Sequence, residues 1–250
     1  MRNFDGNKIA IFGDWHGNLA FAATALAHVH ATEAPALYLH VGDFGFWPAD
    51  NEESWVPEYL PGLEKLLAAQ GVTLLFVDGN HEHFDWLASF PVDEHGLRKI
   101  SDHLYHLPRG SAITVGGKKI VGFGGAASTD RKFRIKDYSW FDAELITEAD
   151  LEKALANVTA DILITHEAPM RRASGGTGSF DMDQITAKQR DYVASAAAGL
   201  DAKLLVHGHH HHGYIDRYLG TEVIGLGCDS VPVSMDAVEM NHVIIELEEL

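Results

Sequence analysis

The sequence has little cysteine and little positive charge, and both shortages narrow what the protein can be. Cys228 is the only cysteine among 250 residues, so the chain has no disulfide framework of its own and no cysteine-based zinc site. This fits a reduced, cytoplasmic setting. Lys and Arg number 19 against 36 Asp and Glu, which gives a formal net charge of −17. Nucleic acids bind through many Lys and Arg contacts to phosphate, so we do not expect a nucleic-acid partner.

A long apolar segment is also missing. The N-terminal stretch MRNFDGNKIA lacks the apolar region of a signal peptide. The longest uncharged stretch, residues 17–32, is Ala-rich and too short to span a bilayer comfortably. We therefore expect a soluble protein without a membrane partner. Hydrophobic residues make up 46% of the chain, enough to bury a core at this length. With no internal repeat or linker, we expect a single domain over residues 1–250.

Short apolar runs alternate with helical segments along most of the chain. The apolar runs predict strands at residues 8–14, 36–43, 72–80, 161–167 and 203–209, and the segments between or after them predict helices at 19–31, 58–70, 82–90, 148–158 and 184–198. Residues 111–125 predict a hairpin around Gly116-Gly117, and further strands follow residue 214. Thr147 and Asp150 resemble a capping box. Continuous apolar strands suit sheets covered on both faces. We predict an α/β fold with either one mixed sheet or two packed sheets, flanked by helices.

Side chains that can bind metal follow five of the predicted strands. In chain order they are Asp14 and His16, Asp43, Asn80 and His81, His166, and His209 and His211. Each alone has an ordinary explanation as a turn, a core histidine or a solvated loop. Their joint occurrence favours one site, because ligands bind outside the carboxyl ends of strands in open α/β sheets. A mixed His, Asp and Asn set suits Mn²⁺, Fe or Zn²⁺ better than Ca²⁺ or Mg²⁺.

The motif order GDxH, GD, GNHE, a lone His and GHxH resembles the calcineurin-like metallophosphoesterase family, and it spans residues 13–211. The resemblance implies an α/β/β/α sandwich, with two mixed sheets between helical layers. It also implies a ligand set: Asp14, His16 and His211 for a first metal; Asn80, His166 and His209 for a second; and Asp43 bridging both. His81 would lie beside the metals without binding them and would protonate the leaving oxygen.

The chemistry implied is hydrolysis of a small phosphomonoester or phosphodiester, with two divalent ions, Mn²⁺ favoured in vitro. The two ions carry a charge of +4, Asp14 and Asp43 contribute −2, and a bridging hydroxide contributes −1. The centre would then have a net charge of +1, which would attract the phosphate. That hydroxide would attack phosphorus directly, without a phosphoenzyme. Protein phosphatase or nuclease activity at the same site, or a non-catalytic metal-binding scaffold, remain alternatives. The ester preference, the natural substrate, the metal identities and the oligomeric state stay open.

The second motif departs from one branch of the family. Residues 42–48 read GDFGFWP, whereas Ser/Thr protein phosphatases carry GDxVDRG, whose Arg helps to grip phosphate. Trp47 stands where that Arg would fall, which argues against a dedicated protein phosphatase. Phe44, Phe46 and Trp47 either form an aromatic wall beside the site or pack their loop onto the core.

The chain has one basic cluster, in the segment DRKFRIKDYSW, residues 130–140. Arg131 and Arg134 in this segment either clamp the substrate phosphate or belong to a surface loop with no ligand role.

For several residues next to the motifs we expect structural roles. Asn18 either reaches the substrate or caps the helix that follows it, and capping is the favoured expectation. Glu82 is expected to begin a helix and support its motif loop. His207 is expected either to support the ligands from behind or to pack within its strand. Alternation directs His210 and His212 away from the metals, toward solvent or the mouth of the site.

Overall fold

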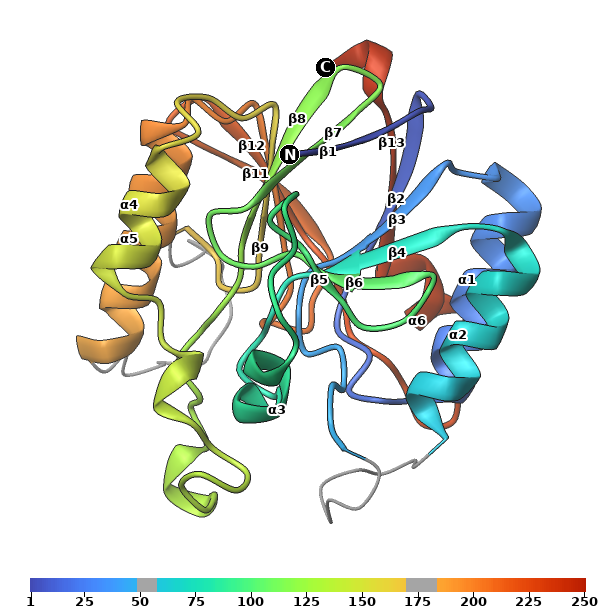
Figure 1. The fold of residues 1–250 in the computed structure, drawn as a ribbon, viewed down its shortest axis with the longest axis horizontal. Helices are drawn as coiled ribbons and strands as arrows, with labels where there is room; N and C mark the ends of the chain where they lie inside the picture. Colours follow the sequence, from blue (N-terminus) through green and yellow to red (C-terminus); the bar gives the residue numbers. More distant parts are fainter. Residues whose placement is uncertain (49–57, 170–183) are drawn as a thin grey trace.

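The structure, a computed structural model, describes residues 1–48, 58–169 and 184–250. Within these residues the strands form a six-stranded and a seven-stranded sheet, both mixed, which pack face to face. Helices cover the outer face of each sheet (Figure 1). The architecture is therefore an α/β/β/α sandwich, and the choice between one sheet and two is settled in favour of two.

The six-stranded sheet carries the first half of the chain and the last strand. Its order is β13-β2-β3-β4-β6-β5. The strands are β2 (Lys8–Phe12), β3 (Leu37–His40), β4 (Thr73–Phe76), β5 (Arg98–Lys99), β6 (Leu104–His106) and β13 (His242–Glu246). The middle strands run parallel, and the two edge strands pair antiparallel. The helices on its outer side are α1 (Leu19–Glu33), α2 (Tyr59–Gln70) and α6 (Met235–Met240).

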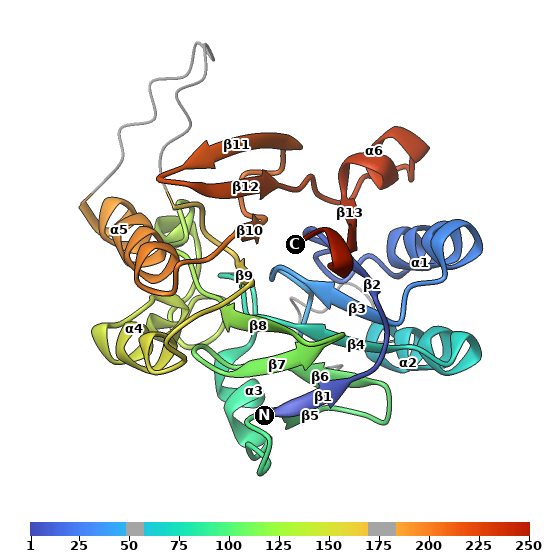
Figure 2. The ribbon, with the colours of Figure 1, turned by 90° about the horizontal axis from the view of Figure 1, so that it is seen from above.

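The seven-stranded sheet has the order β1-β7-β8-β9-β10-β12-β11. The strands are β1 (Arg2–Phe4), β7 (Ala112–Val115), β8 (Lys118–Phe123), β9 (Ile162–Thr165), β10 (Leu204–His207), β11 (Tyr214–Tyr218) and β12 (Thr221–Gly225). The predicted hairpin is confirmed as β7 and β8, joined at Gly116-Gly117. The helices α4 (Glu148–Leu155) and α5 (Gln184–Gly199) cover the outer face. Figure 2 shows them opposite α1 and α2, with both sheets between.

Both faces of the central strands are buried, which explains their continuous apolar sequences. In β2, Ile9 and Ile11 face the core between the two sheets, whereas Ala10 and Phe12 face the core under α1 and α2. Burial on both sides removes the polar–apolar alternation that an exposed sheet would show.

The helix predicted at residues 82–90 is shorter than expected. It is α3 (Phe84–Ser89), and the His83 side chain accepts a hydrogen bond from Trp86 N at its first turn. The expectation that Glu82 begins this helix is wrong, because His83 is the N-cap and the helix starts at Phe84. The two predicted caps are confirmed: Thr147 and Asp150 form a capping box for α4, and Asn18 accepts a hydrogen bond from Phe21 N in α1.

The aromatic residues of the second motif pack into the core. Phe44 and Phe46 are fully buried. The Phe44 ring stacks on Phe76 with centroids 4.4 Å apart, and Phe46 stacks on Trp86 at 4.2 Å. The packing interpretation of this loop is therefore confirmed, and these two rings form no wall of the site. Among the described helices, none has both the length and the apolar character needed to cross a membrane.

A buried ion pair fastens β4 to the other half of the sandwich. Asp78 follows β4, and its Oδ2 accepts hydrogen bonds from Arg109 Nε at 2.8 Å and NH2 at 2.6 Å. The same guanidinium donates to the carbonyls of residues 143, 144 and 145. Burial raises the pKa of Asp78, but the Arg109 charge and the contact with His106 outweigh it and hold that pKa far below its usual value.

Arg109→Ala should lower the free energy of unfolding by about 3–5 kcal/mol, because it leaves a buried carboxylate without its cation. Chemical denaturation of the metal-free protein measures this. Lys99→Ala is the matched control, since it removes an ion pair with Asp102 that is exposed and screened by solvent. Equal losses in the two variants would contradict a structural role for the buried pair.

Candidate metal centre

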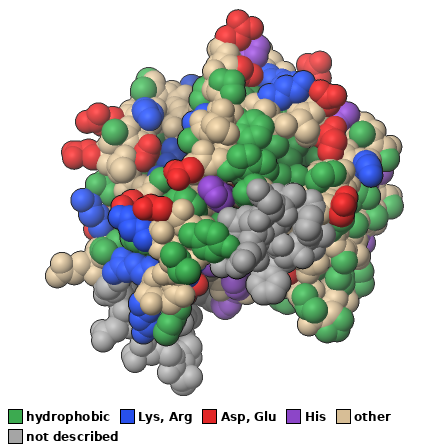
Figure 3. All heavy atoms as spheres, turned by 60° about the horizontal axis from the view of Figure 1, so that its bottom comes forward, with side chains coloured by type: hydrophobic (Ala, Val, Ile, Leu, Met, Phe, Trp, Pro, Cys, Tyr) green, Lys and Arg blue, Asp and Glu red, His purple; other side chains and the backbone are tan. Residues whose placement is uncertain are grey.

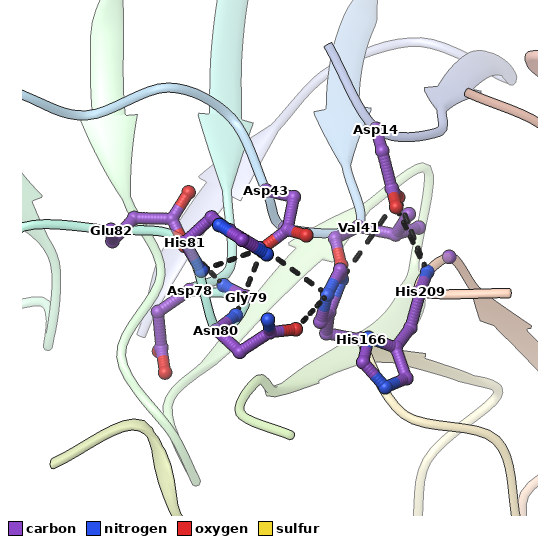
Figure 4. Close-up of polar contacts among 12 residues, drawn as sticks. Asp14, Val41, Asp43, Asp78, Gly79, Asn80, His81, Glu82, His166 and His209 are labelled. Carbon is purple, nitrogen blue, oxygen red and sulfur yellow. Dashed lines mark hydrogen bonds and ion pairs between the residues drawn. The ribbon is translucent and has the colours of Figure 1, made fainter. Parts of the chain in front are cut away.

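The predicted ligands lie in the loops that follow β2, β3, β4, β9 and β10. Three of these strands belong to the six-stranded sheet and two to the seven-stranded sheet. The site therefore lies where the carboxyl ends of both sheets meet, and Figure 4 shows its side chains converging from separate loops. Only the folded sandwich assembles these donors, since they are spread over about 200 residues of sequence.

Two groups of donors share one carboxylate. Asp14, His16, Asp43 and His211 each offer a ligand atom within 4.8 Å of the others, and Asp43, His166 and His209 form a second such group. The two groups coincide with the predicted first and second metal sets, apart from Asn80, whose amide oxygen lies 3.1 Å from His166 Nε2. Asp43 belongs to both groups, as a bridging ligand would.

The first group lies nearer the surface. His16 Nε2 is 3.5 Å from Asp43 Oδ2, and His211 Nε2 is 3.1 Å from Asp14 Oδ2. Both aspartates are buried, whereas the His211 side chain is 46% exposed. This half of the site therefore faces the solvent from which a substrate would enter.

The second group is buried and its donors are oriented by neighbours. His166 Nδ1 must donate to the carbonyl oxygen of Val41 at 2.9 Å, because a carbonyl only accepts. This leaves His166 Nε2 for Asp43 Oδ1 at 3.3 Å or for a cation. The Asn80 amide donates through Nδ2 to Ser128 Oγ at 3.2 Å, so its oxygen is directed at the cluster.

Four of the predicted ligands have left-handed backbone conformations. Nine non-glycine residues of the described chain have positive φ, and among them are His16 (46°), Asp43 (50°), His209 (64°) and His211 (54°). Such conformations are costly for residues with a Cβ and concentrate at functional sites. The surrounding hydrogen bonds must therefore hold these loops in place.

Motif glycines allow the backbone to approach the two carboxylates. A Cβ at Gly79 would overlap the amide and carboxylate of Asp43, and one at Gly208 would overlap Asp14 Oδ1. With these glycines, Asp43 Oδ1 accepts hydrogen bonds from the amides of Asn80 at 2.9 Å and His81 at 2.8 Å. The backbone of His209 donates to Asp14 at 3.0 Å.

The two buried carboxylates, Asp14 and Asp43, favour the binding of positive charge next to them. Among the described residues, every ion-pair partner of Asp14 and Asp43 is a histidine. Burial lowers the pKa of His166, but Asp43 and Asp14 outweigh it and raise that pKa to about 9. The hydrogen bond to Asp14 raises the pKa of His211 to about 10. Two buried carboxylates among imidazole and amide donors fit divalent cations of the Mn²⁺, Fe or Zn²⁺ kind.

His81 lies beside the donors and belongs to neither group. Its ring centroid is 5.9 Å from that of His16, and its carbonyl accepts a hydrogen bond from Trp47 Nε1 at 2.7 Å. Burial lowers its pKa, and Arg134 lowers it further against the opposing effect of Asp43. The placement suits a proton donor next to the metals, and its role stays a prediction.

The two arginines of the basic segment differ in their positions. Arg134 donates to Ser128 Oγ at 2.9 Å and reaches the Asn80 carbonyl at 3.4 Å, so it lies at the edge of the second group. Arg131 lies in η1 (Arg131–Phe133), earlier in the same loop. In Figure 3, Lys and Arg side chains gather on this face to one side of the histidines.

The histidine run divides as expected into cluster members and neighbours. His209 and His211 belong to the donor groups. His207 is buried in β10 and bonds Tyr214 Oη at 2.6 Å, which confirms its packing role. His210 belongs to neither donor group, and its Nε2 lies 3.0 Å from buried Glu167 Oε1. His212 lies against the Tyr214 ring.

The family model for calcineurin-like phosphoesterases matches residues 7–213 of this chain. The chain belongs to the calcineurin-like phosphoesterase family. No match was found among the curated proteins.

The chain is similar to several solved structures. A dimetal phosphatase from Danio rerio has a TM-score of 0.53 at 14% identity, and the match covers 88% of this chain and 87% of that one. GAP50, the anchor in the inner membrane complex of Plasmodium, has a TM-score of 0.48 at 13% identity, and the match covers 88% of this chain and 71% of that one. A phosphatase from Mycoplasma pneumoniae has a TM-score of 0.45 at 12% identity, and the match covers 90% of this chain and 73% of that one. At these identities the likeness concerns the fold alone.

Sequence reasoning missed several residues that orient the family motifs. Ser128 directs the Asn80 amide, and buried Glu144 accepts hydrogen bonds from both the amide and the hydroxyl of Ser128. Glu167 holds His210 and Arg190. Asp229 contacts His16. Asp229 follows the end of β12, so the strand-end pattern used for the ligands could have found it.

Glu82 of the GNHE motif acts as a clamp between two metal-binding loops. Its Oε1 accepts a hydrogen bond from Phe44 N and its Oε2 one from Gly79 N, both at 2.6 Å. The loop after β3 is thereby tied to the loop after β4. The expectation that Glu82 supports the motif loop is confirmed, through a buried carboxylate and not through a helix.

Glu82→Ala should lower the free energy of unfolding by at least about 2 kcal/mol, because two buried N–H groups lose their acceptor. Denaturation of the metal-free protein measures the loss. Glu94→Ala, at a side chain that is 87% exposed, is the control and should change stability little. A Glu82→Ala protein as stable as this control would rule out the clamp.

Proposed function

We propose that this protein hydrolyses small phosphoesters at a centre of two divalent metal ions bridged by Asp43. The observation that carries the proposal is the sharing of Asp43 by two separate donor groups. A single ion would need only one of these groups. Two ions about 3.5–4 Å apart are suited to hold the attacking and leaving oxygens of a phosphoryl transfer.

The chain would hold the two ions asymmetrically. Asp14, His16 and His211 would bind one ion at the exposed side, and Asn80, His166 and His209 would bind the other in the buried part, with Asp43 common to both. When bound, the ions would supply Lewis acidity and activate water for direct attack on phosphorus. A net charge of −17 disfavours the approach of anions, so the metals would provide the local charge that attracts phosphate.

His81 would act as the general acid. Its backbone is fixed by the amide contact to Asp43 and by the contact from Trp47 to its carbonyl. A proton on its ring would be within the site and available to a leaving oxygen. Arg134 at the rim would favour the negative charge of the ester, and Arg131 belongs to the same loop.

A small ester is favoured over a polymer. The basic residues described near the site are few: those of the loop with Arg131 and Arg134, and Arg190, which pairs with Glu167, whereas a nucleic-acid strand needs an extended basic track. The missing motif Arg at position 47, where Trp47 is largely buried, also disfavours a protein phosphatase.

The proposal is tested with metal-stripped protein refilled with Mn²⁺ and assayed on para-nitrophenyl phosphate and bis-para-nitrophenyl phosphate. We expect turnover that needs metal and is lost in Asp43→Asn, because the shared ligand loses its charge. The preferred ester distinguishes phosphatase from phosphodiesterase. Two bound ions with no turnover of either ester would contradict general activity on small esters.

His81→Ala sharpens this test through the leaving group. On phenyl phosphate, whose phenolate needs a proton, we expect kcat to fall by about 10²–10⁴-fold. On para-nitrophenyl phosphate, whose leaving group departs as an anion, the fall should be much smaller. His95→Ala, an exposed loop histidine, should match the wild type on both. Equal falls of His81→Ala on the two esters would show that His81 is not the acid.

A further inference from the structure

Asp229 lies behind one candidate ligand of the metal centre without belonging to either donor group. It is in the loop after β12, and its side chain is 16% exposed. Its Oδ1 lies 2.9 Å from His16 Nδ1, and its Oδ2 accepts a hydrogen bond from Asn18 Nδ2 at 2.8 Å. Both carboxylate oxygens are therefore engaged by residues of the loop between β2 and α1.

This contact determines which nitrogen of His16 is available to a metal. An ionised carboxylate only accepts hydrogen bonds, so Nδ1 of His16 must carry the proton that it shares with Asp229. The other nitrogen, Nε2, faces Asp43 Oδ2 at 3.5 Å. Nε2 is therefore the nitrogen of His16 that a metal ion beside the shared carboxylate could bind.

His16 needs such support more than a ligand on a regular strand would. Its backbone has a positive φ of 46°, and its side chain is 28% exposed, so neither backbone nor burial fully fixes the ring. Imidazole ligands of metals are commonly held by a carboxylate on their second nitrogen, which fixes the tautomer and raises the basicity of the ligand.

Asp229 is itself held in place. Its backbone amide donates to the carbonyl of Asp14 at 2.9 Å. Asn18, which binds its Oδ2, is in turn fixed because its own Oδ1 accepts from Phe21 N at the start of α1. The first turn of α1, Asn18, Asp229 and His16 thus form one connected chain of hydrogen bonds that ends at the metal centre.

We propose that Asp229 is a positioning residue that fixes the tautomer and orientation of His16 for the first metal ion. The inference rests on the proposed two-metal centre and adds a residue to it. The only candidate ligand side chain that the Asp229 carboxylate contacts among the described residues is His16, so we expect the ion that His16 binds to be affected most and the ion held by His166 and His209 to change little.

The test is calorimetric titration of metal-stripped Asp229→Asn protein with Mn²⁺, beside the wild type and Asp236→Asn. Asparagine keeps the shape and removes the charge, and Asp236 is an exposed aspartate of α6 that controls for the change in net charge. We expect two ions to bind the wild type and the control alike. In Asp229→Asn, one of the two ions should bind about 10–100-fold more weakly.

Two further measurements separate positioning from a merely structural role. Asp229→Glu, which keeps the charge, should recover part of the lost affinity. The thermal unfolding of the metal-free Asp229→Asn protein should stay close to that of the wild type. Lower stability of the metal-free protein with unchanged Mn²⁺ affinity would overturn the inference.

The inference and the proposed function fail in different ways. Two ions bound equally tightly by the wild type and by Asp229→Asn would overturn the role of Asp229 and leave the two-metal centre intact. A wild-type protein that binds fewer than two ions would overturn the proposed function, and the inference with it.

Discussion

The carboxylate of Asp43 joins loops that come from both sheets. Its Oδ1 accepts the amides of Asn80 and His81 after β4, and it faces His166 after β9. Its Oδ2 faces His16 after β2. A fully buried carboxylate is unfavourable unless it is paired and hydrogen-bonded. The arrangement of the strand-end loops meets this requirement, and in doing so it places the other donors around the carboxylate.

The same requirement connects the stability of the sandwich to its site. Glu82 and Asp43 act reciprocally, because each carboxylate accepts amides from the loop that carries the other. Farther out, Arg109 ties Asp78 to the segment that holds Glu144, and Glu144 in turn fixes Ser128 against the Asn80 amide. The donors are thus supported by successive layers of buried polar contacts, as pre-organised sites require.

The local sequence predicted the strands, the helices and the donor residues, but few of the contacts that hold those donors in place. Each donor follows an apolar run, so strand ends such as those at Asp14 and Asp43 were readable along the chain, and the motif order pointed to two sheets. The contacts behind them are not local. His16 and Asp229, which are in contact, lie 213 residues apart in the sequence, and Phe44 and Glu82 lie 38 residues apart. Whether Phe44 and Phe46 faced the site or the core likewise depended on partners that only the fold supplies.

The central claim, that one carboxylate bridges two metal ions, is tested most directly by anomalous diffraction from crystals of the protein grown or soaked with Mn²⁺. The account predicts two manganese peaks about 3.5–4 Å apart, with Asp43 between them and His166 and His211 on opposite ions. A single peak, or two peaks that do not share Asp43, would contradict it.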